Sequence, residues 1–193
     1  LYSKTKPATL GEVDGFFSHS WHDPAEPKYS ALQSWRARLV TSAETPEPTI
    51  WLDKACIDQK NIAANLQALP VFLSGCKELI VVAGATYSSR LWCVMEIFVF
   101  LKMGGSQERI WLADLGGDSV KSMLTSFDAS KAKCFLKRDR ERLFAVIESG
   151  YGDFVRFNKT VRGIFAGGQG AAVSVLHRDG AGAGDEGKDV PPA

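Results

Sequence analysis

The residue with the clearest chemical potential is an acid inside a long apolar run. Every residue from 91 to 101 is apolar except Glu96. If this run is a helix, the residues three and four positions from Glu96 are Trp92, Cys93, Val99 and Phe100, and none of them pairs with a carboxylate. Such a helix is normally buried, and a buried carboxylate without a partner is costly or has a raised pKa. We therefore expect either a distant partner, such as an Arg, a Lys or a backbone amide, or a cleft in front of Glu96.

Three clusters of polar side chains accompany this acid, and each follows a predicted strand. They occupy residues 18–23, 53–60 and 86–90, and the third leads directly into the run that holds Glu96. Ligands of doubly wound parallel sheets bind beyond the carboxyl ends of the strands. We therefore expect the three loops to enclose one site.

Each polar residue also has a plain structural interpretation. His19 and His22 fit loop hydrogen-bonding roles better than metal ligation, because no third His or Cys has suitable spacing, so we predict no metal site. Asp53 fits a cap at the start of a helix or turn. Trp21 fits either the core or a stacking platform. A Ser-His-Asp triad in the first cluster is disfavoured, because adjacent side chains point apart and no G-x-S-x-G turn is present.

Short apolar strands alternate with helical patterns along the chain, which predicts an α/β fold with a doubly wound parallel sheet. The predicted strands are residues 13–18, 49–52, 78–83, 109–113 and, as an edge strand, 130–136. The predicted helices are residues 30–40, 61–75, 91–101, 118–126, 138–148 and 153–165. We expect Ser30 to cap the first helix, Pro70 to kink or interrupt the second, and Gly75 to end it.

The patterns divide the chain into four segments. Residues 1–12 form a lead-in or linker, 13–136 the main domain, 137–166 a helical extension packed on it, and 167–193 a Gly-rich tail. The tail has few large apolar residues, so we expect it to be disordered.

Composition excludes several classes of protein. The 193 residues are 45% hydrophobic, which is enough for one hydrophobic core. The net charge is only +1, so the chain has no overall positive potential that would attract nucleic acid. The basic residues at 131–142 are interrupted by acids and are interpreted as a solvated helix face. The four cysteines lack a C-x-x-C pair, which favours reduced thiols in a cytoplasmic protein. No apolar run has the roughly 18 residues of a membrane span, and no signal peptide is recognisable.

Three stretches together resemble the Toll/interleukin-1 receptor (TIR) domain family. They are V-D-G-F-F-S-H at 13–19, W-L-D at 51–53 and S-R-L-W-C-V-M-E-I at 89–97, and the last is similar to the family's W-C-x-x-E helix. The resemblance implies a flavodoxin-like sheet of about five parallel strands. It also implies cleavage of NAD, as substrate, at the nicotinamide–ribose bond, with Glu96 as the essential carboxylate.

The resemblance also implies a mechanism and a set of contacts. The carboxylate of Glu96 would stabilise a ribosyl oxocarbenium ion or hold the ribose hydroxyls, and nicotinamide leaves as a neutral amine, so a general acid is not essential. By loop position we assign the base, hydroxyl and phosphate contacts of NAD to Phe17, Ser18, Ser20, Trp21, Asp53, Ser89, Arg90 and Trp92.

One motif departs from this family. Residues 51–59, W-L-D-K-A-C-I-D-Q, are closer to the second-strand motif of heterokaryon-incompatibility domains. In TIR proteins the following loop helps to build assemblies, so homotypic self-association is the partner expected for this signalling module of a larger protein. The alternatives are a non-enzymatic assembly module and a nucleotide-binding sensor.

Overall fold

The computed structural model describes residues 2–57, 68–116, 125–134, 136–166 and 172–175. Its centre is a parallel sheet in the order β2-β1-β3-β4, with β5 paired beside β4. The strands are β1 (Val13–His19), β2 (Ile50–Trp51), β3 (Cys76–Ala83), β4 (Ile110–Asp114) and β5 (Ala172–Val175). The central strand β3 is buried on both faces, as its continuous apolar run predicts.

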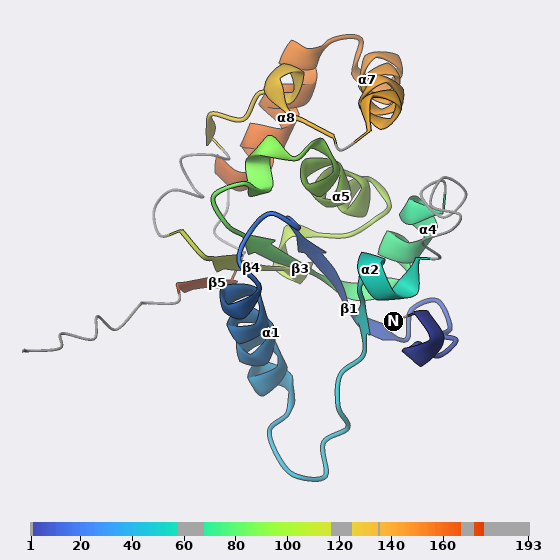
Figure 1. Ribbon diagram of the computed structural model, residues 1–193, viewed down its shortest axis with the longest axis vertical. Helices are drawn as coiled ribbons and strands as arrows, with labels where there is room; N and C mark the ends of the chain where they lie inside the picture. The colour runs from blue at the N-terminus through green and yellow to red at the C-terminus, as the bar shows by residue number, and fades with distance from the viewer. Residues whose placement is uncertain (1, 58–67, 117–124, 135, 167–171, 176–193) are drawn as a thin grey trace, which may run out of the picture.

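Helices cover both faces of the sheet (Figure 1). They are α1 (Ala25–Leu39) on one face, and α4 (Leu69–Ser74) and α5 (Leu91–Lys102) on the other. Alternation along β1 directs Phe16 into the core beneath α4 and α5, and Phe17 into the core beneath α1. The same alternation places Ser18 on the α5 face, where the candidate site lies.

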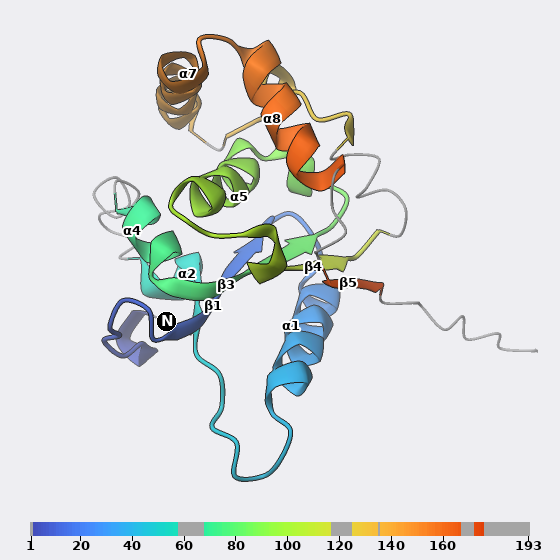
Figure 2. The same cartoon turned by 180° about the vertical axis from the view of Figure 1, so that it is seen from behind.

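Two C-terminal helices, α7 (Lys137–Tyr151) and α8 (Phe154–Ala166), lie on the outer side of α5 (Figures 1 and 2). The sheet side of α5 contributes Ile97 and Phe100 to one core cluster. Its outer side contributes Leu91, Val94 and Phe98 to a second cluster with α7 and α8. Because α5 is buried between two layers, it is apolar on nearly all sides, and the prediction of C-terminal helices is confirmed.

Short helical turns complete the described chain. They are α2 (Asp53–Cys56) and the 3-10 turns η1 (Tyr2–Lys4), η2 (Tyr87–Ser89), η3 (Gln107–Arg109) and η4 (Ala129–Lys131). None of the described helices is both long and apolar enough to cross a membrane.

The prediction of an edge strand at 130–136 is wrong. This segment forms η4 and a single bridge between Lys133 and Arg90. Its alternation arises because Ala132 and Cys134 pack against the cluster of α5 and the C-terminal helices, while Lys131 and Lys133 remain exposed. The position beside β4 is taken by β5, four residues within the segment predicted as a tail; residues 167–171 and 176–193 lie outside the described chain.

Two of the described helices begin beside a proline. The first helix begins at Ala25 directly after Pro24, so Ser30 lies inside it and is not a cap. Pro70 lies in the first turn of α4, where its missing amide hydrogen has no helical partner to lose; the residues before 68, on which the predicted kink or interruption depends, lie outside the described chain. Gly75 is the C-cap, as predicted. Residues 61–67 of the second predicted helix, and 118–124 of the next helix after α5, lie outside the described chain.

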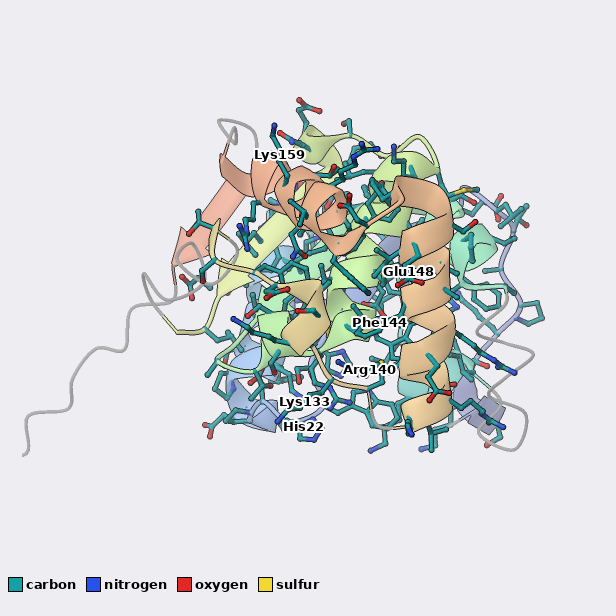
Figure 3. The ribbon with its side chains drawn as sticks, turned by 90° about the horizontal axis from the view of Figure 1, so that it is seen from above. His22, Lys133, Arg140, Phe144, Glu148 and Lys159 are labelled. Carbon is teal, nitrogen blue, oxygen red and sulfur yellow. The ribbon has the colours of Figure 1, made fainter. Side chains whose placement is uncertain are left out.

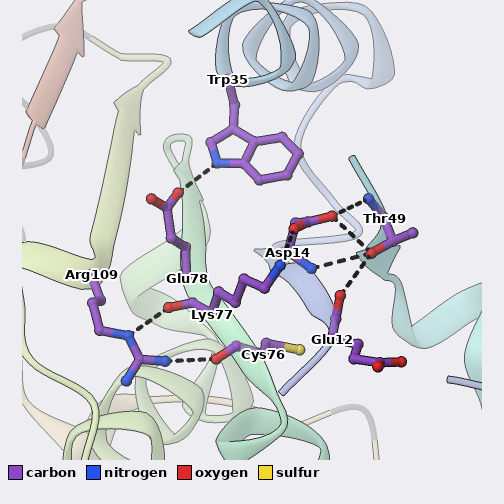
Figure 4. A network of polar contacts seen from close by, with 8 residues as sticks. All are labelled: Glu12, Asp14, Trp35, Thr49, Cys76, Lys77, Glu78 and Arg109. Carbon is purple, nitrogen blue, oxygen red and sulfur yellow. Dashed lines mark hydrogen bonds and ion pairs between the residues drawn. The ribbon is translucent and has the colours of Figure 1, made fainter. Parts of the chain in front are cut away.

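A polar network ties the strands together at their amino ends, opposite the candidate site (Figure 4). Asp14 of β1 accepts hydrogen bonds from the Thr49 amide and from Lys77 Nζ, both at 2.8 Å. Trp35 of α1 donates its indole N–H to Glu78 of β3 at 2.9 Å. These contacts fix β2, β1, β3 and α1 relative to one another, and so fix the loops at the other edge.

Candidate functional site

Glu96 lies in the second turn of α5, beside the carboxyl end of β1. Ser18 Oγ donates a hydrogen bond to Glu96 Oε2 at 2.5 Å. The side chain of Ser18 is fully buried, whereas Glu96 is only partly buried. None of the ion pairs among the described residues includes Glu96, and none of their hydrogen bonds reaches Oε1. One carboxyl oxygen is therefore anchored, and the other has no hydrogen-bond partner among the described residues.

Tyr87 of η2 extends this contact into a chain of hydroxyl groups. Its hydroxyl is 2.6 Å from Ser18 Oγ and 3.1 Å from the Cys93 carbonyl oxygen, to which it donates. The Tyr87 side chain is buried, because η2 turns it under the start of α5. Three oxygen atoms, one each from Tyr87, Ser18 and Glu96, thus lie in contact. They join the loop after β3 and the end of β1 to the second turn of α5. Sequence reasoning missed Tyr87; its place in the 86–90 cluster was the available signal.

The surroundings favour the neutral form of Glu96. Burial raises the pKa of Glu96 to about 8; the hydrogen bond from Ser18 opposes this rise, and the charge of Asp53 adds to it. Burial also raises the pKa values of Tyr87 and Cys93. In the unliganded protein at neutral pH, Glu96 therefore holds a proton most of the time.

A second polar cluster joins the loops after β1 and β3. Thr86 Oγ1 lies 2.7 Å from Ser20 Oγ and 2.8 Å from Asp23 Oδ1, and the Thr86 amide also donates to Asp23 Oδ1. Asp23 is buried against Gly84, where a Cβ atom would lie 2.5 Å from its carboxylate. Only a glycine at position 84 permits this approach, so the cluster holds the two loops in a fixed arrangement.

Trp21 lies on the surface and not in the core, with 55% of its area exposed. Its indole N–H donates to Asp53 Oδ2 at 2.7 Å, and Lys54 Nζ lies 5.7 Å from the ring centroid. Asp53 also accepts a hydrogen bond from the Lys54 amide, but it is the first residue of α2, the N-cap position is Leu52, and no side chain caps the helix, so the predicted capping role is not confirmed. The contact between Trp21 and Asp53 joins the loops after β1 and β2, and more than half of the Trp21 surface remains exposed.

The histidines have separate positions. The side chain of His19 lies beside Phe17, and burial lowers its pKa, although Asp53 opposes this. His22 is exposed. Within the described chain no group of three His, Cys, Asp or Glu side chains is arranged to hold a metal ion.

The remaining predicted contact residues divide by position. Phe17 is buried beneath α1, on the opposite face of the sheet from Glu96, which does not support a stacking role. Ser89 is exposed and bonds the Thr86 carbonyl at 2.7 Å. Arg90 is partly exposed at the start of α5, and Trp92 is partly buried between the two core clusters that meet on that helix.

This arrangement of side chains defines the candidate site. In comparisons with known proteins, no family model and no curated protein matches the sequence. The arrangement offers an acid with one oxygen that has no partner in the described part of the chain, a chain of hydroxyl groups behind it, and an exposed indole at the same edge of the sheet. Such a site suits the stabilisation of a developing positive charge better than proton transfer between paired acids.

Proposed function

We propose that this chain is a TIR-like module with a flavodoxin-like sheet that cleaves NAD at the nicotinamide–ribose bond. The observation that carries the proposal is the position of Glu96: partly exposed at the ligand-binding edge of a parallel sheet, without a cation to pair with among the described residues. It stands in the W-C-V-M-E segment that resembles the family's motif. A purely structural acid would be expected to have its charge matched by a neighbouring Arg or Lys.

In this mechanism Glu96 acts through charge. As the glycosidic bond lengthens, positive charge develops on the ribose, and the ionised carboxylate lies close enough to stabilise it. The nicotinamide ring of NAD is itself cationic, so substrate binding lowers the pKa of Glu96 and favours the ionised form. Ser18 keeps Oε2 in place while Oε1 faces the ribose.

The loops around Glu96 supply the binding contacts in this proposal. Trp21 stacks on a base, and Asp53 fixes the indole through the hydrogen bond at 2.7 Å. Arg90 lies at the start of α5, at the same edge of the sheet as Glu96, and it contacts a phosphate. Phe17 has no part in binding, because it lies beneath α1.

The test is nicotinamide release from NAD by the wild-type protein and by Glu96→Gln. The variant keeps the shape and hydrogen-bonding capacity of the side chain but not its charge, so NAD binding should persist while turnover falls by ~10²-fold or more. The control is Glu148→Gln, which makes the same change at an exposed position on α7 and should leave turnover unaltered. A Glu96→Gln variant as active as the wild type would remove this residue from catalysis.

A wild-type protein that releases no nicotinamide at any concentration would instead favour the assembly-module function. NAD binding without turnover would favour a nucleotide sensor. These outcomes separate the three functions in one set of measurements.

A further inference from the structure

The hydroxyl chain behind Glu96 has more contacts than protons when the acid is ionised. Three contacts join Glu96 to Ser18, Ser18 to Tyr87, and Tyr87 to the Cys93 carbonyl, at 2.5, 2.6 and 3.1 Å. Ser18 and Tyr87 carry one hydroxyl proton each, and a carbonyl carries none. Only two of the three contacts can then be hydrogen bonds. A proton on Glu96 supplies the third.

The chain therefore has two complete arrangements that run in opposite directions. With Glu96 ionised, Tyr87 donates to Ser18 and Ser18 donates to the carboxylate. With Glu96 protonated, Glu96 donates to Ser18, Ser18 donates to Tyr87, and Tyr87 donates to the Cys93 carbonyl. That carbonyl lies inside α5 and is satisfied by the helix when Tyr87 turns away from it.

We propose that Tyr87 is a positioning residue for Glu96, and that its hydroxyl switches between Ser18 and the Cys93 carbonyl as Glu96 loses or gains its proton. Burial of Ser18 and Tyr87 favours the switch, because neither hydroxyl can turn to water to satisfy its proton. The catalytic consequence rests on the proposed function, in which only the ionised acid stabilises the ribosyl cation. The switch itself is a property of the free protein.

The charged and titratable groups around the acid do not replace this chain. Asp53, at the start of α2, acts on Glu96 by repulsion and favours its protonated form. Cys93 lies on α5 itself, and burial keeps its thiol neutral. Further groups at this edge, on β1, α1 and the adjoining loops, are His19, Asp23, Lys28 and Arg90, and their charges act on one another and on Cys93.

The proposal predicts opposite effects for the two hydroxyl groups. Ser18→Ala removes the donor to the carboxylate and should raise the pKa of Glu96. Tyr87→Phe removes two hydrogen bonds from the protonated arrangement but one from the ionised arrangement, so it should lower that pKa. Each shift should be on the order of half to one unit. If the Tyr87 hydroxyl were only a buried polar group, its loss would make the surroundings less polar and raise the pKa.

The measurement is a carbon-13 NMR titration of the glutamate carboxyl groups without NAD, in which Glu96→Gln identifies the Glu96 signal. Tyr151→Phe is the matched control, because it removes a buried tyrosine hydroxyl in the outer cluster that has no hydrogen-bond partner among the described residues, and it should leave the titration unchanged. A pKa that rises or stays constant in Tyr87→Phe would overturn the proposal.

A second measurement needs only the wild-type side chains. The ring resonances of Tyr87 should titrate with the same midpoint as Glu96 and should become independent of pH in Glu96→Gln. Resonances that do not follow Glu96 would also overturn the proposal. Because NAD is absent from both titrations, their outcome is independent of whether the protein cleaves NAD.

Discussion

A buried acid with a raised pKa makes protein stability depend on pH in a defined direction. Below about pH 4.5, Glu96 is protonated in both the folded and the unfolded chain. Between that value and its folded pKa of about 8, the unfolded chain loses the proton while the folded protein keeps it. Glu96 thus lowers the free energy of unfolding progressively across this window, by roughly 1.4 kcal/mol for each unit of pKa difference.

This linkage gives a prediction for Glu96→Gln that does not depend on enzymatic activity. Glutamine does not ionise, so the variant escapes the loss of stability at high pH. Its melting temperature should be close to that of the wild type near pH 5 and clearly higher near pH 8 to 9. Thermal melts of both proteins across this pH range measure the difference in melting temperature. Other titrating groups affect both proteins equally, so their contribution cancels in this difference. A gain of the same size at every pH would show that desolvation of the ionised acid is not the cause.

At the scale of elements, side chains of α1 and β3 fill the space beside Gly15 of β1. Gly15 provides the space: a Cβ atom at this position would lie 2.9 Å from Trp35 Cζ2 and closer still to the side chain of Ile80. Trp35 in turn bonds Glu78 of β3. The indole therefore joins the helix to two strands, and a small residue in β1 is what admits it.

Gly15→Ala should consequently destabilise the protein by about 1–3 kcal/mol, because a tightly packed core admits no extra methyl group. The matched control is Gly150→Ala in α7, where a Cβ atom meets nothing within 4 Å. That change should be neutral or should stabilise the protein by up to about 1 kcal/mol, because alanine favours the helix. Urea denaturation measures both. Equal stability of Gly15→Ala and the wild type would contradict the packing described here.

In the extension formed by α7 and α8, the basic residues of α7 do not all face solvent. Arg140, Phe144 and Glu148 follow one another along α7 (Figure 3). Arg140 donates to the Ala132 carbonyl at 3.0 Å, and its guanidinium lies 4.2 Å from the Phe144 ring centroid. The expectation of a solvated basic face is correct for Lys137 but wrong for Arg140, which fastens the segment after η4 to α7.

For the whole molecule, two cores that meet on one helix fix the orientation of the acid. Rotation of α5 would move Ile97 out of the sheet-side core and Phe98 out of the outer core. The helix therefore presents Glu96 to Ser18 in one orientation only. Trp21 remains exposed at this edge of the sheet, with 55% of its area accessible.

If self-association completes the site, activity per molecule should rise with protein concentration, as mass action requires. Nicotinamide release measured over a wide range of concentrations, with the oligomeric state followed by sedimentation velocity, tests this. Activity that stays proportional to concentration while dimers form and dissociate would show that one chain carries the whole site.

The sequence by itself determined the elements whose patterns are local and strong. The strands β1, β3 and β4 and the helix α5 were predicted from runs of apolar residues, which reflect burial on both faces of each element. The lone acid on α5 was found in the same way, because an exception in an apolar run is visible without any structure. The edge strand predicted at residues 130–136 was wrong, because small residues that pack inward against helices can alternate with exposed residues as they do in a strand.

Only the tertiary structure decided which partners meet. Ser18 is 78 residues from Glu96 and 69 residues from Tyr87 in the sequence, so no local pattern joins these three side chains. The identity of the fifth strand was likewise decided by which segment could pair with β4, because a short strand gains its stability from its neighbours and not from its own composition. The sequence determines where a charge is out of place, whereas the distances and burial that set its pKa arise only when distant segments pack together.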